Sequence, residues 1–377
     1  MKRIITCLIS AIISLGAYAQ FTDGFYRLQC KETGRYLAIH NNYVNKESAK
    51  QSGQIDILSL ETITGFDNIV NDPGSVIYLK KTASGYVIEG QGFTTEGRNM
   101  YLQFTEVNGA YRIWTTIKYD GVEYTRYLRD YDAKYGSSYI TTDKTKSSNW
   151  HWYITPVTDA DNQYMGLKGD VKVGSSYYTT FYAAFPIQLG SGMKAYTVDA
   201  LTGNSCTLKE VGNIVPKSTP VVVACAGQDA ASNKVTPLTS GGSAVSDNKL
   251  SGEIFCYPVL TPTGDERRSN PAWNAKDYAP ETMRLLGEDG GKLAFITDSE
   301  MKYLPANRAY LVVAEGSAAS ITVDGTTGIS RITRDLSNTS QAGQAKGTFT
   351  LNGVRVPDNA TPQKGIYIKD GQKVVIK

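Results

Sequence analysis

The chain has 377 residues, including 25 tyrosines and 36 glycines, and its 39 Lys and Arg against 36 Asp and Glu give a formal net charge of +3. So balanced a charge argues against nucleic acid or an anionic membrane as the partner, because both select a concentrated basic surface. A chain of this length is expected to form about two or three domains, and its many turn residues between short apolar segments are typical of an all-β protein.

The first residues predict an export signal. Lys2 and Arg3 precede an apolar run over residues 4–15, and Ala-Tyr-Ala at 17–19 is a small-x-small cleavage site. Removing the signal peptide, residues 1–19, takes away two basic residues and lowers the net charge from +3 to +1. No later apolar stretch approaches the ~18 residues that span a bilayer, so we expect no membrane span. The mature chain is expected to be secreted, displayed on the outer-membrane surface or held in the periplasm.

A short phrase occurs twice in the first part of the chain. Tyr26-Arg27-Leu28 leads to Arg35-Tyr36-Leu37, and Tyr111-Arg112-Ile113 leads to Arg126-Tyr127-Leu128. A repeated strand-turn-strand phrase predicts an architecture built from copies of one β unit. Turn residues bound the strands that we expect here, at 25–30, 35–40, 75–81, 85–89, 100–105, 110–117, 123–129, 138–142 and 150–156.

With its opening Tyr-x-Leu and Tyr-x-Ile strands, its Tyr-Leu strands and a closing Asn-Trp-His-Trp-Tyr-Ile at 149–154, the segment 21–158 resembles the ricin-type β-trefoil. The closing phrase takes the place of that family's Gln-x-Trp core motif. The resemblance implies a β-trefoil-like domain with lectin-like carbohydrate binding.

The segment 163–324 carries Tyr-Thr-Thr-Phe-Tyr-Ala-Ala-Phe-Pro at 178–186, Lys-Ala-Tyr at 194–196 and Ile-Val-Pro-Lys-Ser-Thr-Pro-Val at 214–221. These phrases resemble a β-sandwich module of secreted Bacteroidales proteins, which implies an antiparallel β-sandwich and a lineage. A polar stretch at 325–347 is typical of a linker. Residues 348–377 predict a short β-hairpin module, and Asn-Gly-Val-Arg-Val and Lys-Gly-Ile-Tyr within it resemble the C-terminal sorting-type domain of Bacteroidetes surface proteins.

Residues suited to catalysis are scarce. The chain holds two histidines, His40 and His151, and neither comes with a nucleophile or a metal-ligand spacing such as His-x-x-x-His or Cys-x-x-Cys. We therefore predict no catalytic residue, no metal and no cofactor. The cysteines left after cleavage are expected to be buried free thiols, with a Cys225–Cys256 disulfide as the alternative: Cys30, Cys206, Cys225 and Cys256.

The sequence offers more residues suited to ligand binding than to catalysis. Aromatic faces cover the apolar C–H patches of sugars, while carboxylates and amides take the hydroxyls. The loop after the second Arg-Tyr-Leu phrase carries such groups, and we predict that it binds a ligand through Asp130, Tyr131, Asp132 and Tyr135. The equivalent loop after the first phrase adds Asn41, Asn42 and Tyr43 as predicted ligand-binding residues. The alternative is that these tyrosines are ordinary amphipathic surface residues.

A long insertion at 261–280 adds Trp273 as a further candidate, because loops of this length are often functional; alternatively Trp273 packs on the sandwich. The favoured function is non-catalytic binding of a glycan or polysaccharide outside the cell. One alternative is a structural or adhesive surface protein that binds another protein. The other is a polysaccharide-acting hydrolase with an unrecognised carboxylate pair.

Overall fold

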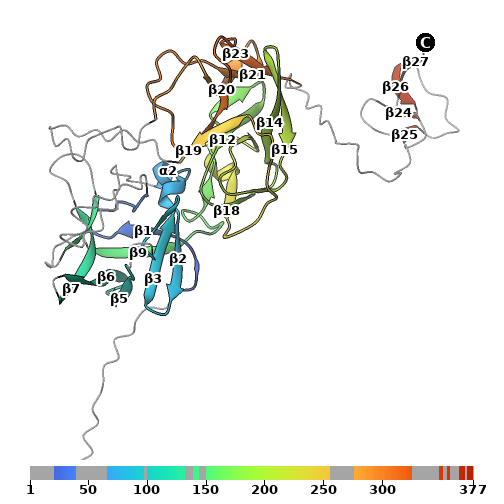
Figure 1. Cartoon of the computed structure of the whole chain (residues 1–377). Helices are drawn as coiled ribbons and strands as arrows, with labels where there is room; N and C mark the ends of the chain where they lie inside the picture. Colours follow the sequence, from blue (N-terminus) through green and yellow to red (C-terminus); the bar gives the residue numbers. More distant parts are fainter. Residues whose placement is uncertain are drawn as a thin grey trace, which may run out of the picture. The chain divides into compact units, whose positions relative to one another are not determined.

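The computed structural model describes residues 21–39, 66–96, 100–119, 121–131, 139–143, 150–254, 276–324, 348–350, 355–356, 365–369 and 372–376. The chain divides into two compact units, Met1–Ser330 and Arg331–Lys377. Strands dominate both, and α2 (Phe66–Ile69) is the one α-helix of the described residues (Figure 1). The prediction of an all-β chain is therefore confirmed.

The described residues before 158 form a nine-stranded antiparallel sheet. Its order is β4-β3-β2-β1-β9-β6-β7-β8, with β5 paired to β6. The strands are β1 (Gly24–Cys30), β2 (Ile77–Thr82), β3 (Gly85–Gly90), β4 (Phe93–Thr94), β5 (Gln103–Val107), β6 (Ala110–Tyr119), β7 (Val122–Tyr131), β8 (Tyr139–Asp143) and β9 (His151–Pro156). The strand expected at 35–40 is reduced within the described residues to a bridge between Gln29 and Tyr36, and β4 was not expected.

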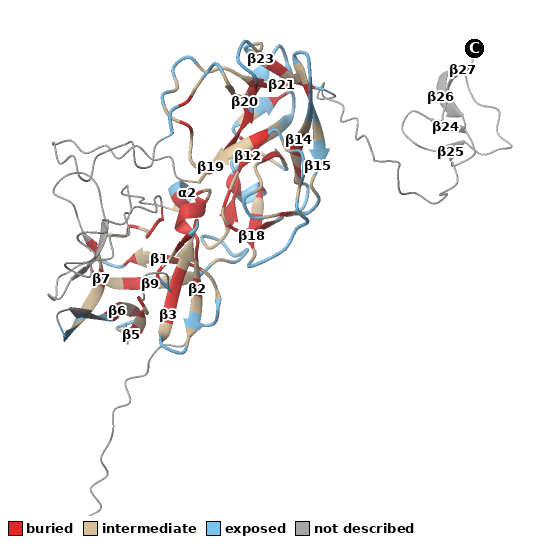
Figure 2. Cartoon of the chain, in the orientation of Figure 1, coloured by how far each residue is buried: buried red, intermediate tan, exposed pale blue. Residues whose placement is uncertain are grey.

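The pairings of this sheet run in a circuit. Strand β1 pairs with β2 and β2 with β3, and Tyr86 of β3 forms a bridge with Leu102, next to the start of β5. From there β5 pairs with β6, β6 with β9, and β9 with β1. Buried residues alternate along its strands (Figure 2), and their side chains form one apolar core. The apolar positions of the repeated phrase are among them, each at most 1% exposed: Leu28, Leu37, Ile113 and Leu128.

Two further sheets follow in the same unit. A four-stranded sheet has the order β10 (Met165–Gly166), β18 (Lys234–Pro237), β13 (Ile187–Leu189) and β16 (Ile214–Val215). A ten-stranded sheet has the order β11 (Val171–Val173), β12 (Ser176–Phe181), β17 (Val221–Cys225), β14 (Lys194–Thr202), β15 (Ser205–Glu210), β23 (Ser320–Val323), β21 (Lys292–Ile296), β20 (Met283–Asp289), β22 (Arg308–Val312) and β19 (Leu250–Glu253).

The ten-stranded sheet is antiparallel apart from the parallel pair β15–β23, and it curls so that its two halves pack face to face. Alternate residues of opposite strands, such as Val198, Val222 and Phe295, are completely buried in the shared core. Arg308 of β22 links the halves by donating to the hydroxyl of Thr179 in β12. The expectation of a sandwich-like second region is met by this arrangement.

The first sheet is joined to these sheets by buried contacts. Val76, just before β2, belongs to the core that fills the space beneath β13 and β17. Phe25 of β1 packs on Phe185 with ring centroids 5.7 Å apart. Arg27 is 3% exposed and its Nη1 donates to the carbonyl of Tyr164 at 2.9 Å. The two regions therefore share apolar and polar contacts within the Met1–Ser330 unit.

The second unit has a four-stranded antiparallel sheet among its described residues. Its order is β25 (Arg355–Val356), β24 (Thr348–Thr350), β26 (Gly365–Lys369) and β27 (Gln372–Ile376). Strands β26 and β27 form a hairpin with continuous pairing from Gly365↔Ile376 to Lys369↔Gln372.

Candidate functional site

Most of the ligand-binding residues predicted from the sequence lie outside the described residues. This holds for Asn41, Asn42, Tyr43, Asp132, Tyr135 and Trp273. Tyr131 is described as the last residue of β7, paired with Tyr139, but its side chain is not. For these positions, ligand binding stays a prediction.

Asp130 is described in full, and it is buried. Asp130 is 3% exposed, and both of its carboxylate oxygens accept hydrogen bonds from Arg35. Nε of Arg35 donates to Oδ2 at 2.8 Å, and Nη2 donates to Oδ1 at 2.7 Å. The hydroxyl of Thr33 donates to Oδ2 at 2.5 Å. A bidentate, charge-assisted pair of this kind fixes geometry strongly. These contacts give Asp130 of β7 a structural role, which is to hold the segment after β1 that contains Thr33 and Arg35.

Lys276, the first described residue after 255–275, contacts side chains of two strands. The ammonium of Lys276 lies 2.5 Å from Oε1 of Glu253 and donates to the hydroxyl of Tyr310 at 3.0 Å. Burial opposes the charge, yet the hydrogen bonds to Glu253 and Tyr310 outweigh it and raise the pKa of Lys276. Lys276 is thus held against Glu253 of β19 and Tyr310 of β22.

A groove of about 400 Å³ lies between the first sheet and the sandwich region. One wall is a cross-strand row in which Phe25, Tyr78, Glu89 and Thr94 face one another on β1, β2, β3 and β4. Since side chains alternate between the faces of a strand, this register places all four on the face away from the core of the first sheet. The other wall consists of residues 184–186, Lys217, Leu238 and Thr239.

Aromatic rings line this groove. The Phe25 ring lies 5.1 Å from that of Tyr78 and 5.7 Å from that of Phe185, measured between centroids. Burial raises the pKa of Tyr78, and the carboxylates of Asp23 and Glu89 add to this against the opposing effect of Lys80. The phenol of Tyr78 therefore stays neutral at physiological pH and can both donate and accept a hydrogen bond.

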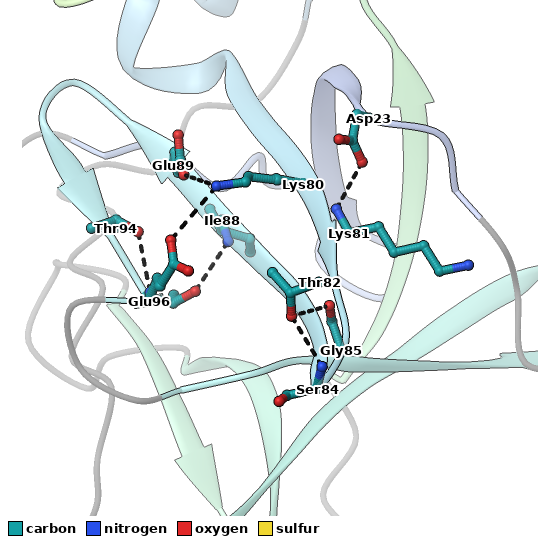
Figure 3. Close-up of polar contacts among 11 residues, drawn as sticks. Asp23, Lys80, Lys81, Thr82, Ser84, Gly85, Ile88, Glu89, Thr94 and Glu96 are labelled. Carbon is teal, nitrogen blue, oxygen red and sulfur yellow. Dashed lines mark hydrogen bonds and ion pairs between the residues drawn. The ribbon is translucent and has the colours of Figure 1, made fainter.

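The carboxylates of Glu89 and Glu96 line the same groove as the rings. Lys80 of β2 lies between them, with Nζ 4.0 Å from Oε1 of Glu89 and 3.7 Å from Oε2 of Glu96 (Figure 3). The hydroxyl of Thr94 accepts from the Glu96 amide at 3.1 Å, which orients the turn after β4. The three charged side chains are 36–46% exposed, so the ion pairs are screened and contribute little to stability. Both carboxylates keep the capacity to accept further hydrogen bonds.

Gln91 connects the two walls of the groove. It occupies the two-residue turn between β3 and β4 with φ +51°, followed by Gly92 at +82°, the pattern of a type I′ hairpin turn. Its Oε1 accepts from the amide of Ala184 at 3.1 Å, which fixes the orientation of the side-chain amide. Its Nε2 is buried without a hydrogen-bond partner among the described residues. Gln91 therefore holds residues 184–186 against the first sheet.

A second cavity of about 530 Å³ opens between β11–β12 and β20–β21. It is larger, and its lining mixes aliphatic side chains with polar and charged ones, among them Arg308 paired to Asp170 at 2.7 Å. No aromatic side chain is among its described lining residues. Because ring faces are the usual platform for a sugar, we consider the smaller groove the better binding site.

The described part of the chain offers little for covalent or metal chemistry. Burial raises the pKa of the free thiols to about 11 for Cys30 and about 12 for Cys206 and Cys225, so all three are protonated at neutral pH. Cys225 is a free thiol in the structure, and Cys256, its partner in the alternative disulfide, lies outside the described residues. His151 contacts Oε1 of Glu32 through Nδ1 at 2.5 Å.

The described residues contain no group of three or more His, Cys, Asp or Glu that could hold a metal ion. None of their helices is long and apolar enough to cross a membrane.

The residues of the groove were not singled out from the sequence. The strands at 75–81 and 85–89 were expected, and their alternation puts Tyr78 and Glu89 on outward faces, but nothing local indicates that Phe185 lies opposite. A search for aromatic and acidic residues on the outer faces of adjacent predicted strands could have found one wall. Comparison with protein-family models, with curated proteins and with solved structures finds no match to this chain.

Proposed function

We propose that this chain is an exported, non-catalytic carbohydrate-binding protein, and that the groove between the first sheet and residues 184–186 is its sugar site. The observation that carries the proposal is the row of Phe25 and Tyr78, facing Phe185 and continued by Glu89. Rings and carboxylates side by side are what a pyranose requires, since one covers its C–H face and the other accepts from its hydroxyls. Grooves between packed sheets are common ligand sites.

The trefoil-like nature of the first region belongs to the same proposal. Its support is the circuit of six strands, β1, β2, β3, β5, β6 and β9, and the convergence of both copies of the repeated phrase on one core. A curled sheet built from repeats is a scaffold on which binding sites are carried by loops and outer faces.

Export and lineage rest on the sequence. The basic and apolar start of the chain with its Ala-Tyr-Ala site supports secretion or display on the outer-membrane surface, with the periplasm as the alternative. The phrases of the sandwich region and of the C-terminal tail support an origin among Bacteroidales.

A hydrolase is the second candidate, because two carboxylates share the groove. Both lie within 4.0 Å of one ammonium nitrogen, which puts their oxygens about 8 Å or less apart, a separation compatible with paired-carboxylate glycosidases. However, Glu89 and Glu96 are 36% and 46% exposed, whereas a general acid at neutral pH needs a desolvated position. Binding without catalysis is therefore favoured.

The test is a glycan array probed with the mature chain, followed by affinity measurements on the best ligand. We expect Tyr78→Ala to weaken binding roughly tenfold or more, the effect of losing about 1.4 kcal/mol from a central aromatic contact. The matched control is Tyr153→Ala, which removes a 39% exposed tyrosine of β9 that does not line the groove. Thermal melting of both variants checks that the fold is retained.

Other outcomes separate the alternatives. Binding that survives Tyr78→Ala but is lost in Tyr131→Ala or Tyr135→Ala would move the sugar site to the loop after β7. Release of reducing ends from a polysaccharide, abolished by Glu89→Gln, would establish the hydrolase. A chain that binds no glycan but retains a protein partner would be an adhesive or structural protein.

A further inference from the structure

The charged groups that line the groove are mainly acceptors. Glu89 and Glu96 border it, and Lys217 is the one basic residue among its described lining residues. Lys80 does not line the groove and reaches the two carboxylates from the side, at 4.0 and 3.7 Å. The side of the groove formed by the first sheet thus presents two carboxylates to a ligand and one ammonium beside them (Figure 3).

These carboxylates remain available to a ligand. Ion pairs of this length between side chains 36–46% exposed are weak, so they compete little with hydrogen bonds from hydroxyl groups. A carboxylate accepts and does not donate, so it pairs with the hydroxyls of a sugar and repels a second carboxylate brought near it. The rings of Phe25 and Tyr78 add an apolar surface that favours an uncharged face.

We propose that the groove takes uncharged sugars and discriminates against uronic acids, an inference that rests on the proposed function. Glu89 and Glu96 are the specificity-determining residues. They favour a hydroxymethyl group over a carboxylate at the position of the sugar that faces β3 and β4. Exposure of both side chains makes the discrimination dependent on ionic strength, because salt screens repulsion between exposed charges.

Matched pairs of ligands test this directly. The mature chain is titrated, with NMR detection, with the methyl glycosides of glucose, galactose and mannose and with the three uronides that differ from them at C6. For the pair that binds best we expect the neutral sugar to bind at least fivefold more tightly at low salt. The ratio is expected to fall towards one as salt is raised.

Variants assign the effect to the two carboxylates. In Glu89→Gln combined with Glu96→Gln, which keeps the shape and one acceptor oxygen of each side chain, the preference for the neutral sugar is expected to disappear. The matched control is Glu106→Gln, which alters an exposed carboxylate of β5 away from the groove and is expected to keep the preference. If the double variant unfolds, Glu96→Gln alone, at the more exposed position, is expected to reduce the ratio.

Three results would overturn the inference. A uronide that binds as tightly as its neutral partner would contradict it, and so would a preference unchanged in the double variant. Both leave the sugar site itself standing, because the ligands still bind. If neither these sugars nor any arrayed glycan binds, the proposed function is wrong and this inference falls with it.

Discussion

At the scale of single residues, the pair of Arg35 and Asp130 is a buried, bidentate polar contact of the first region. Its side chains are 8% and 4% exposed, and the partners are 95 residues apart in the chain. Burying two charges is costly and is offset when the geometry is good and the remaining lone pairs are satisfied. Two hydrogen bonds from Arg35 and one from Thr33 meet this condition.

Removing one charge of this pair should be strongly destabilising. Asp130→Asn keeps the shape but removes the negative charge of this buried bidentate pair, so we expect a loss of about 3–5 kcal/mol in the free energy of unfolding, measured in urea. Arg35→Met with Asp130→Leu should recover most of it, since apolar pairs of similar volume are tolerated there. Glu106→Gln is the control. A change in Asp130→Asn of less than about 0.5 kcal/mol would mean that the pair is not buried in solution.

At the scale of elements, turn chemistry and hydrogen-bond partners decide where strands begin and end. The turn at Asn108 and Gly109, with φ of +52° and +75°, sets Val107 opposite Ala110 and so fixes the register of β5 with β6. The expected strand at 35–40 is reduced to a single bridge within the described residues because its backbone amides donate to carbonyls of different segments. Leu37 donates to the carbonyl of Leu28, whereas Ile39 donates to that of Gly74.

The Asn108–Gly109 turn offers a test at this scale. Gly109→Val places a β-branched residue in the left-handed region, and we expect it to lower the free energy of unfolding by about 1–2 kcal/mol. Asn108→Gly, at a position whose φ glycine also adopts readily, is the matched control and should change it by a few tenths. Urea unfolding measures both. Equal effects of the two substitutions would show that the left-handed conformation is not what limits this hairpin.

At the scale of the Met1–Ser330 unit, the sheets are not independent of one another. Val76, which comes just before β2 of the first sheet, is completely buried in the core beneath β13 and β17. Phe25 of the first sheet packs on Phe185. Arg27 adds hydrogen bonds to the carbonyls of Gln163 and Tyr164, and its guanidinium lies over the Phe66 ring. Separating the regions would expose these groups to water, so the groove walls should keep their spacing while the unit is folded.

We therefore expect the Met1–Ser330 unit to unfold in a single calorimetric transition. Arg27→Ala removes its buried contacts between the regions, including the hydrogen bond to the Tyr164 carbonyl, and should lower the stability of that whole transition by about 2 kcal/mol or more. Lys209→Ala, at an exposed position of β15, is the control. Two resolved transitions in the wild type, with Arg27→Ala affecting the first region alone, would contradict this coupling.

The sequence by itself determined the all-β class and most strands of the first region. These features are local: period-two alternation and turn residues act over a few positions, whatever the rest of the chain does. Tertiary structure decided where function can reside. From the sequence, Asp130 is one carboxylate of a polar loop, and only the structure shows its ion pair with Arg35. Tyr78 is likewise one outward residue of an expected strand, and only the structure shows that Phe185 lies opposite. Such pairings depend on register and on contacts between distant segments, which no local pattern encodes.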